Sequence, residues 1–422
     1  MKNRFVLAVM TAMLVTLGRP ASAQEEQTGG ESVGTPAPPE VADAGADDYA
    51  KRIAESVQRG AEILLERQES LDPRQKKSAK PAEWPYEGVY RVGGEIPIGY
   101  RIGGTSICAM ALLEVPGWDE SKPRREAVSR ALDFVLAALR DKRMGPGFEV
   151  GYDVRGWGHT YALLFLLRLE ELQRVPSNRR STVDKTIRSL ITLLHKGEIL
   201  KYGGWNYSRR RDRSGRIAAS TFMTAPTLQA LFIASANGKK VDPRVIDRGL
   251  DSLEEARLDN SAFQYATNPD RRSEKGFEAV EGAIARMPVC ETTLALAGRG
   301  SVDRIRESLD AFFEHWEWLE KRRRQNGTHI PPFMIAPYYF YYAHYYTAQA
   351  IEMLPVEERP EYRKSLYDVL YKVREESGGW NDRVFDRSEN FGTAMVLLAL
   401  RQPETPLPPK WDPESTKSRR GL

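Results

Sequence analysis

Apolar residues recur with helical spacing along most of the chain, in segments that come in pairs. The first segment of a pair is amphipathic, as in residues 47–70, and the second is shorter and apolar on all sides, as in 105–115 (TSICAMALLEV). A helix with one apolar face lies between core and solvent, whereas a helix that is apolar all round is buried. No segment shows a convincing alternation of apolar and polar residues of the kind typical of a β-strand. The pattern therefore predicts an all-α protein with an outer and an inner layer of helices.

The pairs repeat at similar spacing, which indicates a repeat architecture. The outer helices are expected to begin near Asp48, Ser121, Asn178, Asp242, Ser301 and Glu357. The inner helices are expected near Thr105, His159, Ser220, Pro288, Tyr338 and Asn390. Six such hairpins that close into a ring form an (α/α)6 toroid, with parallel inner helices around a central cavity. An open superhelical solenoid is the alternative.

The tetrapeptide GGWN occurs twice, at 203–206 and 378–381, and each copy continues into Asp-Arg-Ser. The glycines allow the positive φ that reverses a chain after a helix. The tryptophan supplies a large apolar ring that can lie between neighbouring outer helices. We therefore interpret both copies as structural turns, and not as duplicated catalytic loops.

The units around these turns resemble the prenyltransferase and squalene-cyclase repeat: a helix, a Gly-x-Trp turn, a Ser or Thr at the next helix start, and an Ala-Leu-rich helix. The resemblance covers residues 48–401 and is sharp in the third and sixth units. It implies the α/α toroid of terpenoid cyclases and protein prenyltransferase β subunits, but no activity. The Asp-x-Asp-Asp acid motif of squalene-hopene cyclases does not occur in the sequence, which argues against isoprenoid chemistry.

The N-terminus has the features of a secretory signal. Lys2 and Arg4 precede an apolar run, 5–17, and the small residues 21–23 follow in the Ala-x-Ala pattern. The run is too short to span a membrane, which takes about 20 residues. We expect cleavage near Ala23 and export, and a retained N-terminal membrane anchor is the alternative.

The rest of the chain divides into three parts. Residues 24–46 lack large apolar side chains and are expected to be a flexible linker, 47–401 form the toroid, and 402–422 form a Pro-rich tail with Trp411 docked on the body. Loss of three basic residues with the signal reduces the net charge from +4 to +1. A near-neutral protein is not a typical nucleic-acid binder, and no segment after the signal has a transmembrane pattern.

In a toroid the inner-helix N-termini share one face, where their dipoles favour an anionic ligand. The residues expected there are Tyr100, Arg101, Tyr152, Asp153, His159, Cys290, Glu291, His344, Tyr345 and Asn390. Our catalytic candidates are Arg101, Tyr152, Asp153, His159, Glu291 and His344. Hydroxyl residues near the same starts, including Thr105 and Thr393, are expected to cap the helices.

These positions leave three functions open. The first is an exported toroid that binds a ligand or partner at this face, with no specific reaction assigned. The second is a lyase or hydrolase of an acidic polysaccharide, in which arginine neutralises a uronate carboxylate and His or Tyr acts as base. The third is a non-catalytic protein-interaction scaffold.

The resemblance also suggests a zinc hypothesis. Cys290 and His344 match two of the zinc-ligand positions of protein prenyltransferases, but Pro288 occupies the position of the aspartate. Glu291 is a substitute ligand of acceptable chemistry. Because Cys108 belongs to the first repeat and Cys290 to the fourth, a toroid places them too far apart for a disulfide, and we predict two free, buried thiols.

Overall fold

The computed structural model describes residues 44–71, 81–88, 91–147, 154–200, 202–207, 218–268 and 272–413. The chain divides into Met1–Asp47 and Asp48–Leu422, and the account below concerns the second unit. The predicted signal 1–23 and nearly all of the predicted linker lie outside the described residues.

Outer and inner helices alternate along the chain. The outer helices are α1 (Ala44–Arg67), α3 (Lys122–Ala138), α5 (Arg180–Gly197), α7 (Pro243–Glu255), α10 (Val302–Glu320) and α12 (Arg359–Lys372). The inner helices are α2 (Ile98–Glu114), α4 (Arg155–Glu171), α6 (Thr221–Ala236), α9 (Met287–Leu296), α11 (Phe340–Ile351) and α13 (Glu389–Arg401).

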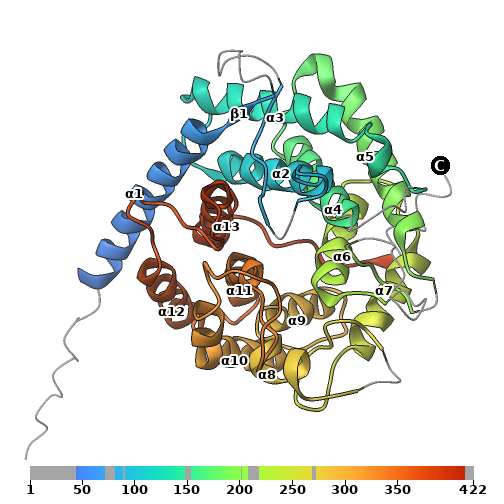
Figure 1. The fold of residues 1–422 in the computed structure, drawn as a ribbon, viewed down its shortest axis with the longest axis vertical. Helices are drawn as coiled ribbons and strands as arrows, with labels where there is room; N and C mark the ends of the chain where they lie inside the picture. Colours follow the sequence, from blue (N-terminus) through green and yellow to red (C-terminus); the bar gives the residue numbers. More distant parts are fainter. Residues whose placement is uncertain are drawn as a thin grey trace, which may run out of the picture. The chain divides into compact units, whose positions relative to one another are not determined.

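The inner helices form a closed ring. Each contacts the next, from α2 through α4, α6, α9 and α11 to α13, and α13 contacts α2 (Figure 1). Closure of the first inner helix against the last identifies an α/α toroid and excludes the open solenoid.

The two layers differ in burial as the sequence pattern predicts. In α5 the buried side chains form one stripe: Val183, Ile187, Leu190, Ile191 and Leu194. In α6 nearly every residue is buried. An inner helix is surrounded by two inner neighbours and an outer helix, so it needs apolar or small side chains on every face.

The remaining elements are short. Two strands, β1 (Glu69–Ser70) and β2 (Ala82–Glu83), pair antiparallel, and α8 (Val280–Ala283) precedes α9. The 3-10 turns are η1 (Lys142–Met144), η2 (Ser177–Arg179), η3 (Gly276–Glu278), η4 (Pro337–Tyr339), η5 (Asp386–Ser388) and η6 (Gln402–Glu404). Within the described part of the chain, no helix has the length and apolar content needed to cross a membrane.

The GGWN tryptophans connect an outer helix to the inner helix that follows. The Trp380 indole donates to the Leu370 carbonyl on α12 (2.8 Å), and its backbone N–H donates to the Thr393 hydroxyl on α13 (3.0 Å). Trp205 makes the same pair of bonds, to Leu194 (2.7 Å) and Thr224 (3.1 Å). These hydrogen bonds support the interpretation of both GGWN copies as structural turns.

Trp84 repeats this arrangement outside any GGWN sequence. Its indole donates to the Leu64 carbonyl (2.7 Å) and its backbone N–H to the Thr105 hydroxyl (2.9 Å). The expectation that Thr105 and Thr393 cap their own helices was therefore wrong, because these hydroxyls bind the preceding loop; neither α2 nor α13 has a side-chain cap.

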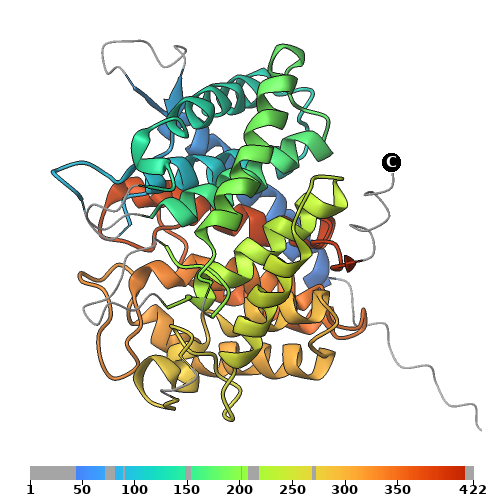
Figure 2. The same cartoon turned by 90° about the vertical axis from the view of Figure 1, so that its right-hand side faces the viewer.

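The C-terminal segment crosses the ring and docks through Trp411. The Trp411 backbone N–H donates to the Leu296 carbonyl at 2.9 Å, and its ring stacks on Phe232 with centroids 5.6 Å apart. Beneath residues 405–409 lies a cavity of about 400 Å³ at the inner-helix C-termini, lined in part by Tyr161 and Tyr345. The expectation that Tyr345 lies at the N-terminal face was therefore wrong. The side view shows the loops before α2 and α11 (cyan and orange) on one side and the red C-terminal segment on the other (Figure 2).

Both cysteines are free and buried, as predicted. Cys108 lies on α2 and donates to the Asn390 carbonyl at 3.4 Å, whereas Cys290 lies on α9.

Candidate functional site

A buried acid follows the second GGWN turn directly. Asp382 is fully buried, and its Oδ2 accepts a hydrogen bond from the Tyr86 hydroxyl at 3.1 Å. Burial raises the pKa of Asp382 to about 7, although Arg383 and the Tyr86 bond oppose the rise. A carboxyl group with a pKa near neutrality can both accept and return a proton at physiological pH.

Aromatic rings from the starts of three inner helices surround Tyr86. Its ring centroid lies 4.2 Å from that of Phe391 on α13, 5.7 Å from Tyr100 on α2 and 5.9 Å from Trp157 on α4. These four residues are the aromatic platform of the site. The platform lies at the inner-helix N-termini, where the sequence predicted the functional face.

Several buried polar atoms at this face have no hydrogen-bond partner among the described residues. They are Oδ1 of Asp382, Nε of Arg383, the Tyr341 hydroxyl and Oδ1 of Asn390. Tyr341 lies close enough for the Asp382 charge to raise its pKa, although burial has the larger effect. Because folded proteins leave few buried polar groups unpaired, these atoms are suited to a polar ligand.

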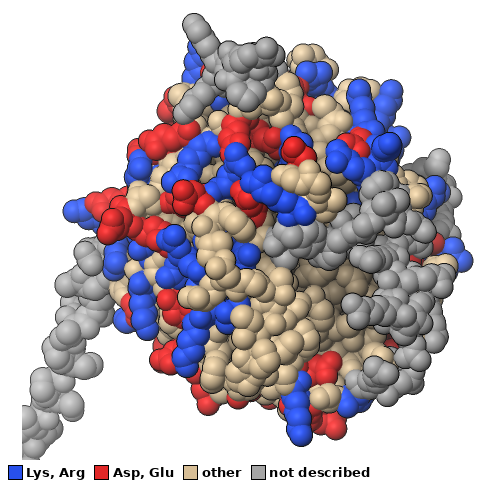
Figure 3. Space-filling view, viewed as in Figure 1, with Lys and Arg blue, Asp and Glu red and all other residues tan. Residues whose placement is uncertain are grey.

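A second aromatic cluster lies around His329. Its Nε2 is 2.8 Å from the Tyr339 hydroxyl and 3.1 Å from the Tyr338 hydroxyl, and its ring packs against Tyr265 and Phe277. Burial lowers the pKa of His329 to about 4, so the ring is neutral at pH 7. The space-filling view shows a broad uncharged surface over α8, α9 and α11 on this face (Figure 3).

Two of the charged candidates, Arg101 and Glu291, form ion pairs with residues outside the predicted site. Arg101 bridges Glu83 on β2 with a 2.8 Å bond from Nε, and lies over the Phe134 ring of α3. Glu291 accepts two bonds from Arg257, at 2.8 and 2.6 Å. Each pair satisfies its charge within the protein, so we assign neither residue to the chemistry.

Both ring nitrogens of the candidate His344 are hydrogen-bonded within the protein. Its Nδ1 lies 2.7 Å from the Phe340 carbonyl, and its Nε2 accepts from the Trp316 indole at 2.8 Å. Burial lowers its pKa to about 4. A neutral ring with both nitrogens in use packs α11 against α10 and has no free atom for a substrate.

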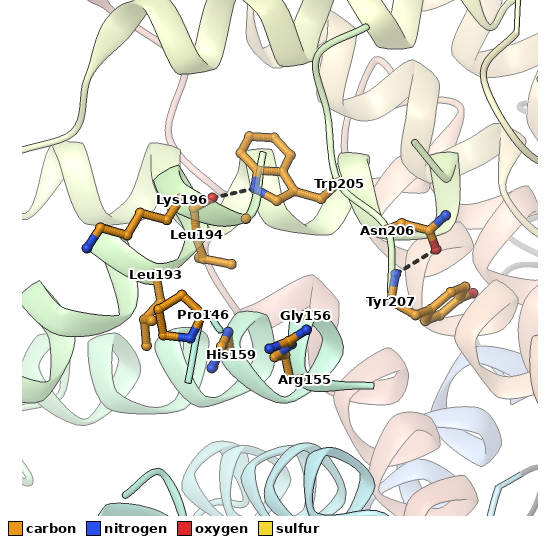
Figure 4. Close-up of a pocket in the computed structure, with 11 residues that line it drawn as sticks. Pro146, Arg155, Gly156, His159, Leu193, Leu194, Lys196, Trp205, Asn206 and Tyr207 are labelled. Carbon is orange, nitrogen blue, oxygen red and sulfur yellow. Dashed lines mark hydrogen bonds between the residues drawn. The ribbon is translucent and has the colours of Figure 1, made fainter. Parts of the chain in front are cut away.

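His159 lines a small cavity beside the first GGWN turn (Figure 4). Its Nε2 bonds the Met144 carbonyl at 3.0 Å, and burial lowers its pKa to about 4. The cavity also contacts Trp205 and Tyr207, and holds about 30 Å³. That volume suits about one or two water molecules and is too small for a sugar.

The candidates that remain are Tyr152, Asp153 and the three proposed zinc ligands. Tyr152 and Asp153 lie outside them. Among the described side chains, no group of three or more His, Cys, Asp or Glu is arranged to hold a metal ion. The proposed zinc ligands Cys290, Glu291 and His344 are thus not brought together.

The sequence analysis missed Tyr86, Asp382 and Arg383. A signal was present: the two GGWN copies differ at the next position, with Tyr207 in the first and Asp382 in the second. A carboxylate that replaces an aromatic residue after an otherwise repeated turn marks a local departure from the repeat.

The comparisons with known proteins identify the fold only. No protein-family model and no curated protein matches the sequence. A cellobiose 2-epimerase from Bacillus thermoamylovorans aligns with a TM-score of 0.54 and 11% identity, over 85% of this chain and 100% of that one. An inactive variant of the α-1,6-mannanase GH76A from Salegentibacter sp., in complex with α-1,6-mannotriose, aligns with a TM-score of 0.51 and 10% identity, over 83% and 99%. A variant of the type II terpene cyclase MstE from Scytonema aligns with a TM-score of 0.47 and 12% identity, over 84% and 98%. Together with the closed ring of inner helices, the first two alignments show that this protein has the α/α-toroid fold.

Proposed function

We propose that this chain is an exported protein that binds an acidic carbohydrate at the inner-helix N-terminal face and transfers a proton with Asp382. The observation that carries the proposal is the buried Asp382 carboxyl group, which is bonded to Tyr86 and has a second oxygen without a partner. The signal-like residues 1–23 support export.

The neighbouring groups favour an eliminative reaction on a uronate. In this reaction Asp382 Oδ1 takes the proton α to the uronate carboxyl group, the bond from C4 to the glycosidic oxygen breaks, and a C4–C5 double bond forms. The Arg383 guanidinium bonds the Gln325 and Gly327 carbonyls through Nη1, and its Nε has no partner among the described residues. Bound to the uronate carboxylate through Nε, it would make the proton α to that carboxylate more acidic. The unpartnered Tyr341 hydroxyl is the candidate proton donor to the leaving oxygen.

The aromatic platform favours a sugar as ligand. The rings of Tyr86, Tyr100, Trp157 and Phe391 are at most 7% exposed and pack largely against one another, and they combine apolar surface with hydroxyl and indole groups as small-molecule sites do. The cellobiose 2-epimerase and the α-1,6-mannanase named above are carbohydrate-active toroids, which makes a carbohydrate the first ligand class to test.

A hydrolase is the alternative within the same substrate class. Hydrolysis of a glycosidic bond uses two carboxyl groups, roughly 5 to 10 Å apart. The Glu375 carboxylate acts on Tyr341 as Asp382 does, but it is held in ion pairs with Arg323 at 2.8 Å and Arg324 at 2.7 Å and is not free to act as the second group. This favours elimination.

The test is a screen of the purified chain against alginate, polygalacturonate, hyaluronan and chondroitin sulfate. Formation of 4,5-unsaturated products is measured by ultraviolet absorbance, and new reducing ends are measured in parallel. We expect absorbance to increase with one of these polymers and to be lost in Asp382→Asn. Asp303→Asn, which alters an exposed carboxylate on α10, should keep full activity. Reducing ends without absorbance would indicate a hydrolase, and neither product with any polymer would contradict the proposal.

A further inference from the structure

An open groove of about 900 Å³ is lined in part by Phe385, Asp386 and Arg387, which follow Asp382 closely in the chain. It is bounded by the C-terminal end of α1, the residues after Tyr86 and the turn η5. The lining residues used below are Arg67, Glu69, Glu87, Phe385, Arg387 and Asn390. Its volume lies within the range of about 300 to 1,000 Å³ that is typical of ligand sites.

The charges around this groove are paired with one another. Arg387 bonds Glu69 at 2.6 Å and lies 3.7 Å from Glu87, which also pairs with Arg91 at 2.5 Å. Arg67 pairs with Glu389. A carboxylate already neutralises the charge of each of these arginines, so the groove does not favour a uronate or a sulfate over a neutral ligand.

Two features of the groove suit a neutral polyhydroxylated ligand. The Oδ1 of Asn390 is buried without a partner in a residue that is 2% exposed, and it can accept a hydroxyl hydrogen. Phe385 is half-buried, with the Arg383 guanidinium 5.7 Å from its ring centroid. Paired carboxylates keep free lone pairs that accept further hydroxyl hydrogens.

The groove and the Asp382 site share three chain segments, which are residues 86–87, 382–387 and 390–391. Tyr86 bonds Asp382, and the next residue, Glu87, lines the groove. In α13, Asn390 lines the groove and Phe391 belongs to the platform. One polysaccharide bound across these segments would therefore contact both the groove and the Asp382 site.

We propose that this groove is a subsite for neutral sugar residues of the carbohydrate that reacts at Asp382, an assignment that rests on the proposed function. Phe385 stacks on a sugar ring, and Asn390 and Glu87 accept its hydroxyl hydrogens. The substrate is then a heteropolysaccharide with neutral sugars beside the uronate, and not a uniform polyuronate.

The experiment is calorimetric titration of the full chain with neutral hexasaccharides of glucose, mannose and xylose, and with hexagalacturonate. We expect at least one neutral hexasaccharide to bind, and its Kd to increase tenfold or more in Phe385→Ala and in Asn390→Ala. Val384→Ala alters the exposed neighbour of Phe385 and should leave the Kd unchanged. Circular dichroism and urea unfolding identify any variant that fails to fold, and Phe385→Ala provides the decisive comparison if Asn390→Ala does so.

The outcomes separate this inference from the proposed function. Asp382→Asn should lose turnover but keep neutral-sugar binding, since Asp382 lies outside the groove lining. No binding of any neutral hexasaccharide, or equal binding by wild type and Phe385→Ala, would overturn the subsite. Neutral-sugar binding without turnover of any acidic polymer would support the groove as a sugar subsite and would contradict the proposed elimination at Asp382.

Discussion

The Tyr86 hydroxyl donates to Oδ2 of Asp382 across 3.1 Å, although the two residues are 296 positions apart in the chain. Tyr86 lies before the first inner helix and Asp382 before the last. The bond therefore forms only when the ring closes, with α13 against α2. A site that depends on this bond forms together with the complete fold.

Replacement of Asp382 by asparagine should abolish turnover while the fold is kept. Positioned acid–base groups contribute about 10²- to 10⁴-fold to rate, so we expect kcat to fall at least 100-fold with a smaller change in KM. Asparagine has nearly the same volume and can still accept from Tyr86. Unchanged kcat in a folded Asp382→Asn protein would exclude Asp382 as the proton acceptor.

The pH dependence of turnover should follow Asp382. The carboxylate is the active form of a base, so kcat/KM should increase with pH through about 7, the pKa that burial gives this group. The Tyr86 bond lowers that pKa. Tyr86→Phe should therefore move the midpoint to higher pH, and a midpoint that stays fixed or moves to lower pH would contradict the assignment.

The tryptophan turns should contribute measurably to stability. Thr393→Val leaves the Trp380 backbone N–H buried without an acceptor, which costs about 1 to 3 kcal/mol. Thr224→Val should have a similar effect at Trp205. Urea unfolding measures both, with the exposed Thr328→Val as control. A loss no larger than that of the control would show that the hydroxyl bonds do not hold these loops.

Buried histidines should make the fold sensitive to acid. Burial lowers the pKa of His344 to about 4, below the value of about 6.5 expected in the unfolded chain. A group with a depressed folded pKa contributes stability above its unfolded pKa, and the contribution is lost as the pH falls through the folded pKa. The loss for His344 is about 3 kcal/mol between pH 6.5 and 4.

Chemical unfolding across this pH range tests the histidine prediction. His344→Gln can still accept from Trp316 but does not titrate, so its stability should fall less steeply with acid than that of the wild type. Leu309→Ala removes buried volume on α10 without a titrating group and should keep the wild-type slope. Equal slopes in all three proteins would exclude His344 as a source of acid sensitivity. Asp382 acts in the opposite direction, because its raised pKa stabilises the fold as the pH falls from about 7.

The two thiols should be unreactive in the folded protein. Burial raises the pKa of both Cys108 and Cys290, which keeps them protonated and shielded from reagent. Titration with a thiol reagent should find no rapid reaction in native protein and two thiols after unfolding without reductant. A count of zero in the unfolded protein would reveal a disulfide and contradict the arrangement of α2 and α9.

The C-terminal segment should be held mainly by Trp411. Trp411→Ala removes the stacking on Phe232, and we expect a stability loss of about 1 to 3 kcal/mol. Hydrogen exchange should increase at the C-terminal ends of α6 and α9. Lys410→Ala, at the exposed neighbouring position, should change neither quantity. Exchange that stays at the wild-type rate would show that the segment is held elsewhere.

The contact of α13 with α2 decided between a closed ring and an open solenoid. The sequence by itself determined the helical pairs, their inner and outer layers and the structural role of GGWN. These depend on local periodicity and on turn chemistry, both of which are visible along the chain. It also predicted that the inner-helix N-termini share one face, because parallel helices bring these ends together; the functional role of this face stays a prediction.

Only the tertiary structure decided which side chains at that face are available. Arg101, Glu291 and His344 have side chains suited to catalysis, but each is bonded to another part of the protein. Their respective partners are Glu83, Arg257 and Trp316. These partners lie outside the candidates' own helices, so helical spacing gives no sign of them. Asp382 was missed for the converse reason: its pKa and its unpartnered oxygen arise from burial by distant segments, which exist only in the closed ring.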